Sequence, residues 1–274
     1  MPSPRTIGTT PVPALGFGCM GFGIPSKTPQ SEEESLALLT AAADRGLTFW
    51  VTSDAYGPSE SLLGKWFQQT GRRSDIFLVT KFGIDRSAGK MDLRGDPEYV
   101  KQACQASLTN LQTNYIDLYM QHRVDPAIPI EHTVAAMKQL QEEGKIRYLG
   151  LSECSERTLR RASKVHPIAA AEMEYSLFAM DIEDPAVGVL AAARELGVKI
   201  IAYSPLGRGF LTGAIRGRED FDEGDMRLSH PRFSEENFAA NLKLVEALEA
   251  IAAEKGCTVG QLALAWLVAQ GDGE

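Results

Sequence analysis

Short apolar segments of strand length alternate with longer amphipathic segments along this chain. The apolar segments are residues 15–18, 48–52, 76–80, 116–120, 148–152, 168–173 and 198–203. Helical periodicity covers residues 31–45, 97–111, 130–143, 156–163, 185–196, 237–255 and 258–269. The first of these helices opens on a capping signal, Ser31 followed by Glu34. Strand and helix patterns in alternation predict βαβ units and a parallel sheet.

Polar and aromatic residues gather where these predicted strands end. They are Asp54, Tyr56, Lys81, His122, Ser152, Glu153, Glu174, Tyr175, Tyr203 and Ser204. In a closed barrel all such ends meet at one mouth, whereas in an open doubly wound sheet most would be strung along an edge. No Gly-x-Gly-x-x-Gly follows a strand and opens a helix, which weakens the dinucleotide-fold alternative. We therefore predict an α/β fold, a (β/α)₈ TIM-type barrel, as a single domain over residues 1–274.

Composition and charge exclude several classes of protein. Of 274 residues, 28 are Lys or Arg and 36 are Asp or Glu, so the net charge of −8 argues against nucleic acid as a partner. An apolar fraction of 44% and a charged fraction of 23% are those of an ordinary globular protein. The four cysteines form no Cys-x-x-Cys pair, and no apolar run is long enough for a membrane span. We expect a cytoplasmic protein with no metal site.

Three strand-end residues could together protonate a carbonyl oxygen. Tyr56 would donate the proton, Lys81 would lower the tyrosine pKa by favouring the phenolate, and His122 would orient or polarise the carbonyl. Each residue also has a plainer interpretation, as a rim aromatic, a surface lysine or a structural histidine. The barrel favours the chemical interpretation because it would bring all three to one mouth.

The segment after the last predicted strand has the composition of a phosphate-binding loop. Loops after the late strands of such barrels often bind phosphate. Amides freed by Gly207, the hydroxyl of Ser204 and the fork of Arg208 are suitable donors to a pyrophosphate. A proline-glycine turn is the structural alternative. The following residues, 207–236, form the longest irregular stretch, which we expect to act as a lid or binding element.

From about residue 15 to residue 270 the chain resembles the aldo-keto reductases, in the subgroup of fungal and bacterial single-chain enzymes related to pyridoxal and aryl-alcohol reductases. The motifs that carry the resemblance are residues 15–21, 49–57, 79–82, 117–122, 144–153, 172–176 and 203–213. It implies reduction of a small or aromatic aldehyde or ketone by NADP(H), with Tyr56 as proton donor, Lys81 as its activator and His122 orienting the carbonyl. The cofactor-binding residues that it implies are Met20, Gly21, Ser152, Glu153, Glu172, Tyr203, Ser204, Leu206, Gly207 and Arg208.

Within its motifs the chain departs from the family at a catalytic position. Val51 stands where the family has an aspartate, and Asp54 would face away at an odd offset along the strand, so we expect Lys81 to lack a partner. At position 172 the chain has Glu where the family more often has Gln.

The chain also stops short of the family pattern. The sequence ends soon after the last predicted helix, so we expect strand eight, its following helix and the segment that grips the 2′-phosphate to be missing. These departures lead us to expect an impaired reductase. The alternatives are a non-redox enzyme on the same barrel, catalysing dehydration or isomerisation, and a non-catalytic truncated relative.

Overall fold

A parallel sheet forms the centre of the fold. The structure is a computed structural model that describes residues 2–23, 30–86 and 89–271. Across those ranges the main sheet has seven strands, in the order β3-β4-β5-β8-β9-β10-β11, and each predicted apolar segment supplies one of them. The strands are β3 (Phe17–Gly18), β4 (Phe49–Val51), β5 (Phe77–Phe82), β8 (Ile116–Gln121), β9 (Ile146–Ser152), β10 (Ala170–Glu174) and β11 (Lys199–Tyr203). The curled parallel sheet confirms the predicted α/β barrel class.

Contacts divide the chain into two compact units. Unit 1 comprises Met1–Glu172 and Pro185–Ile201, and unit 2 comprises Met173–Asp184 and Ala202–Glu274. None of the described helices is long and apolar enough to cross a membrane.

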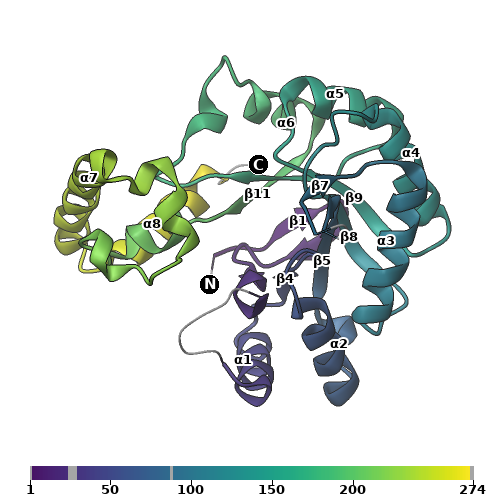
Figure 1. The fold of residues 1–274 in the computed structure, drawn as a ribbon, viewed down its shortest axis with the longest axis horizontal. Helices are drawn as coiled ribbons and strands as arrows, with labels where there is room; N and C mark the ends of the chain where they lie inside the picture. Colours follow the sequence, from purple (N-terminus) through teal and green to yellow (C-terminus); the bar gives the residue numbers. More distant parts are fainter. Residues whose placement is uncertain (1, 24–29, 87–88, 272–274) are drawn as a thin grey trace. The chain divides into compact units, whose positions relative to one another are not determined.

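Six helices cover the outer face of the sheet in unit 1 (Figure 1). They are α1 (Glu32–Asp44), α2 (Ser59–Thr70), α3 (Pro97–Asn110), α4 (Ile130–Glu142), α5 (Glu156–Val165) and α6 (Val189–Leu196). Helix α1 begins with the predicted capping box, in which Ser31 and Glu34 satisfy each other's backbone amides. Helix α2 was not predicted. Its Gly64 is required by packing, because a Cβ there would lie 2.3 Å from the carbonyl oxygen of Asn110 on α3.

The inner face of the sheet in unit 1 is apolar at the end where the strands begin. A hairpin of β1 (Arg5–Ile7) and β2 (Thr10–Val12), also not predicted, adds side chains to this core. The cluster contains Ile7, Val12, Phe49, Phe77, Val79, Leu118, Met120 and Ala170. Val51 packs against it, so the position where the family pattern requires an aspartate lies in an apolar layer. A second small hairpin joins β6 (Ile84–Asp85) to β7 (Asp92–Leu93).

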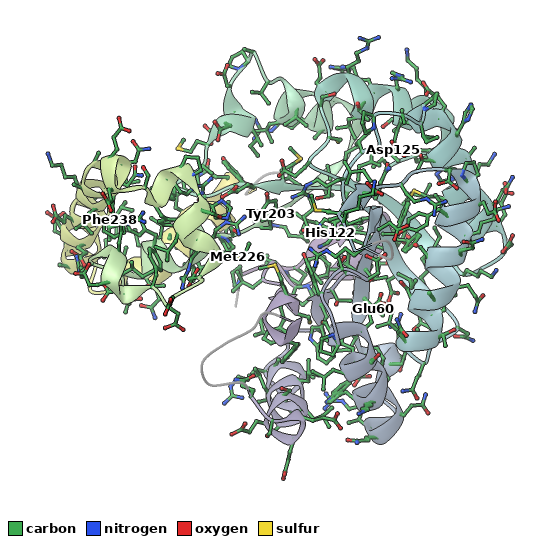
Figure 2. All side chains as sticks on the ribbon, in the orientation of Figure 1. Glu60, His122, Asp125, Tyr203, Met226 and Phe238 are labelled. Atoms are coloured by element: carbon green, nitrogen blue, oxygen red, sulfur yellow. The ribbon has the colours of Figure 1, made fainter. Side chains whose placement is uncertain are left out.

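Unit 2 has an aromatic core of its own. Its helices α7 (Glu235–Glu254) and α8 (Val259–Gln270) pack with the 3₁₀ turns η4 (Gly207–Thr212) and η7 (Pro231–Phe233). Phe210, Phe233 and Phe238 are buried in edge-to-face contacts, and Figure 2 labels Phe238 in this unit. Residues 207–236 are therefore a folded layer of short helical turns rather than the irregular stretch that the sequence predicted.

Candidate active site

The inner face of the sheet becomes polar where the strands end. Strand periodicity explains the change, since alternate residues share a face. Lys81 lies two residues beyond the core residue Val79 on β5, and Glu172 lies two residues beyond Ala170 on β10. The polar side chains of unit 1 thus lie above the apolar core.

Tyr56, Lys81 and His122 come together in unit 1, as predicted. The Tyr56 and His122 rings meet edge to face with centroids 5.7 Å apart, and Lys81 Nζ lies 5.3 Å from the Tyr56 centroid. Burial raises the pKa of Tyr56 above its usual value, and Lys81 offsets that rise only in part. Lys81 lowers the tyrosine pKa as expected, but desolvation outweighs the lysine charge and the net pKa is raised. A phenol that keeps its proton at neutral pH suits a proton donor.

Lys81 has a carboxylate partner, contrary to expectation. Its fully buried Nζ donates to both carboxylate oxygens of Glu172, at 2.9 Å each. The two side chains are 0% and 6% exposed. The sequence-based expectation failed because it looked for the partner on the neighbouring strand β4, whereas Glu172 approaches from β10.

His122 is held as a neutral imidazole. Burial lowers its pKa to about 3, and the nearby cations Lys81, Arg123 and Arg86 contribute further. Nδ1 lies 3.1 Å from the hydroxyl of Ser53, which is fully buried. Ser53 lies in the motif at residues 49–57, but no role was predicted for it. Its place three residues before Tyr56 was the only available signal.

The remaining predicted residues of unit 1 surround this cluster. The hydroxyl of Ser152 is buried and accepts a hydrogen bond from Arg123 at 3.2 Å. Glu153, with a left-handed φ of 49°, donates its amide to the carbonyl of Glu172. Met20 and Gly21 begin the turn η1 (Met20–Gly23), where the Met20 side chain is 39% exposed.

Asp54 faces a different environment, as its offset along the strand predicted. Burial and the charge of Glu60 raise its pKa to about 7. Glu60 in turn accepts a hydrogen bond from Thr80, whose side chain alternates with that of Lys81 on β5. Asp54 is therefore grouped with a second acidic residue and takes no part in the Lys81 ion pair.

In unit 2 the segment after β11 forms a tight turn. Ser204 and Arg208 adopt left-handed φ values of 53° and 57°. The amide of Gly207 donates to the carbonyl of Ser204, and that of Gly209 donates to the carbonyl of Leu206. The expectation of glycine amides left free for phosphate was wrong, because the turn itself consumes them. The side chains supply positive charge instead. Burial is the main cause that lowers the pKa of His230, and the charges of Arg208 and Arg232 lower it further.

Comparison with known proteins agrees with this arrangement. The model of the aldo/keto reductase family matches residues 14–273. The chain belongs to this family. Aldo-keto reductase yakc [NADP(+)] of Schizosaccharomyces pombe is 51% identical over 98% of this chain and 80% of its own length. Aldo-keto reductase str7 of Strobilurus tenacellus is also 51% identical, over 99% of this chain and 81% of its own length.

Among solved structures, this aldo-keto reductase chain is similar to the glycerol dehydrogenase AKR11B4 from Gluconobacter oxydans. The TM-score is 0.88 at 26% identity, and the match covers 98% of this chain and 84% of the other. The family assignment agrees with the resemblance drawn from the sequence motifs.

Proposed function

We propose that this aldo-keto reductase uses NADP(H) to reduce a small or aromatic aldehyde or ketone to the alcohol. The observation that carries the proposal is the contact of Tyr56 with both Lys81 and His122 in unit 1. The name of the fission-yeast relative, which specifies NADP(+), supports the choice of cofactor.

The donor set of the chain fits a dinucleotide phosphate. In unit 1, Ser152 and Glu153 offer polar groups at the end of β9, suited to a carboxamide. In unit 2, the Tyr203 ring is suited to stacking on a flat heterocycle, and Arg208 near His230 provides positive charge for phosphate groups. We propose that these residues, with Met20, Gly21, Ser204, Leu206 and Gly207, hold the cofactor. When bound, the reduced nicotinamide supplies a hydride to the carbonyl carbon.

The proton that completes the alcohol comes from Tyr56. Its hydroxyl is protonated at neutral pH because burial disfavours the phenolate. As the carbonyl oxygen gains negative charge, Tyr56 donates its proton to that oxygen, and the ammonium of Lys81 stabilises the resulting phenolate. His122 remains neutral and offers a ring N–H to the same oxygen when Ser53 donates to Nδ1.

The expected impairment rested partly on an unpaired Lys81. Because Lys81 is paired with Glu172, we propose that the proton-donating group of this enzyme is intact. Turnover should therefore be limited by substrate fit rather than by a missing charge.

The test is a coupled measurement of NADPH oxidation and alcohol formation with a panel of small and aromatic aldehydes and ketones. We expect equal amounts of cofactor consumed and alcohol formed. Y56F should lose about 10²–10⁴ in kcat, the usual contribution of a general acid. Consumption of a carbonyl compound with no NADPH oxidation would contradict the proposal and indicate the non-redox alternative. Equal turnover by Y56F would also contradict it.

A further inference from the structure

Lys81 is a buried cation whose surroundings fix its position. The ammonium is fully buried at the end of β5, where a charge is costly unless it is paired. Its Nζ lies 2.9 Å from each carboxylate oxygen of Glu172. This contact restrains the position of the ammonium as well as balancing its charge. Lys81 is thereby held over the Tyr56 ring, with Nζ 5.3 Å from the ring centroid.

The carboxylate reaches Lys81 across the inner face of the sheet. In the strand order, β8 and β9 stand between β5 and β10. The immediate neighbour β4 offers no charge: Val51 pairs in register with Val79 and packs in the apolar cluster. The neighbouring acid Asp54 is grouped with Glu60 instead. Among the described residues, Glu172 is the one acid that forms an ion pair with Lys81.

We propose that Glu172 is a positioning residue for proton transfer, acting through Lys81 on Tyr56. This inference rests on the proposed function. It assigns Glu172 a role other than the cofactor contact that the family resemblance implies, because both of its oxygens lie within hydrogen-bond distance of Lys81. Glu172 balances the charge of Lys81 and holds its ammonium near Tyr56. A carboxylate on β10 thereby takes the place of the aspartate that position 51 on β4 lacks.

The first test is E172Q, which keeps the shape of the side chain and removes its charge. We expect kcat to fall about 100-fold, within the range for loss of one member of an acid–base group. KM and Kd for NADPH should change by less than about threefold, whereas a cofactor-binding role would change them most. The matched control is E60Q, which neutralises a buried acid bonded to the adjacent Thr80 but not to Lys81. Its kcat should stay within about threefold of wild type.

The pH profile separates positioning from a structural role. Groups facing Lys81 are Glu172 from β10, Tyr56 after β4, His122 after β8 and Cys19 after β3. Without the Glu172 charge, the pKa of Tyr56 is lower, because Glu172 is one of the groups that raise it. We therefore expect the alkaline fall of kcat in E172Q to begin at least about one pH unit below that of wild type. An unchanged profile would overturn the proposal.

The decisive test is a double variant that moves the carboxylate from position 172 to position 51. This variant stays informative if E172Q alone fails to fold. V51D/E172Q places the carboxylate on β4, on the inner face that Val51 already occupies. We expect kcat within about tenfold of wild type. A folded double variant with kcat still about 100-fold down would overturn the proposal. A wild-type chain that reduces no carbonyl would instead contradict the proposed function, whereas wild-type turnover with a fully active E172Q rejects the role of Glu172 alone.

Discussion

The hydroxyl of Ser53 lies 3.1 Å from Nδ1 of His122, and both side chains are buried in unit 1. The same hydroxyl also accepts a hydrogen bond from the backbone amide of Ala55 and lies 3.3 Å from the carbonyl oxygen of Lys81. When Ser53 donates to Nδ1 of the neutral ring, the ring hydrogen of His122 is on Nε2. The orientation of the imidazole is thus linked to the turn that carries Tyr56.

Removing that hydroxyl should slow reduction without unfolding the protein. In S53A the imidazole can adopt either tautomer, so we expect kcat to fall about tenfold while KM for NADPH is unchanged. S59A is the matched control, because the buried Ser59 hydroxyl contacts Thr52 rather than His122. Steady-state kinetics on the two variants checks this. Equal effects of S53A and S59A would refute the specific role of Ser53.

His122 should not titrate near neutral pH. Its pKa of about 3 arises from burial and from the positive charges of Lys81, Arg123 and Arg86, all of which disfavour the imidazolium. Histidine ring signals followed by NMR from pH 5 to pH 8 should include one that does not shift. H122N identifies it by its disappearance. A midpoint between pH 6 and 7 for that signal would show that the ring is solvated.

Because of Asp54, the free energy of unfolding should fall as pH rises from about 4 to about 7. Its pKa is about 4 in the unfolded chain and about 7 in the fold, so its protonated form is favoured by folding. The stability that it contributes is fully present below about pH 4 and lost as pH rises towards 7. D54N should therefore be more stable than wild type by about 1–3 kcal/mol at pH 8, with the difference vanishing near pH 4. Urea unfolding at the two pH values measures this, and equal differences at both would contradict it.

Adding an aspartate at position 51 alone should not improve the enzyme. Lys81 already has its carboxylate, and a second one must be desolvated in an apolar layer. We expect V51D to lower the free energy of unfolding by about 1–3 kcal/mol with no gain in kcat. V51N, similar in size and uncharged, separates polarity from charge. A tenfold rise of kcat in V51D would mean that Glu172 leaves Lys81 incompletely neutralised.

The aromatic core of unit 2 should unfold as one local region. Phe233 is fully buried and contacts Phe210 and Phe221, so F233A should cost about 3–5 kcal/mol. Hydrogen exchange should accelerate in α7 and the preceding turns, while β5 and β8 of unit 1 stay protected. L244A, at an exposed position of α7, should change stability by less than about 0.5 kcal/mol. Uniform acceleration in both units would contradict a separate core.

Local patterns predicted the elements better than the contacts between them. Short apolar runs identified the seven strands that the main sheet has in the described residues, since burial on both faces makes such strands plainly apolar. Helix α2 was not predicted, because a glycine at its centre, Gly64, weakens the local helical signal. The close approach of helix α3 requires that glycine, and the local sequence does not show this contact. The partner of Lys81 could not be predicted either. Glu172 is 91 residues away, and only the curvature of the sheet brings it near.

That separation also bears on the order of events during folding. An ion pair between β5 and β10 forms only after four strands have joined in sequence, because β8 and β9 lie between them. Contacts of such long range carry a large loop-closure entropy and form late. In a chain that has folded only as far as β5, Tyr56 and Lys81 can already be close together, but Glu172 has not yet formed its ion pair with Lys81. We therefore expect recovery of activity during refolding to lag behind recovery of helical structure.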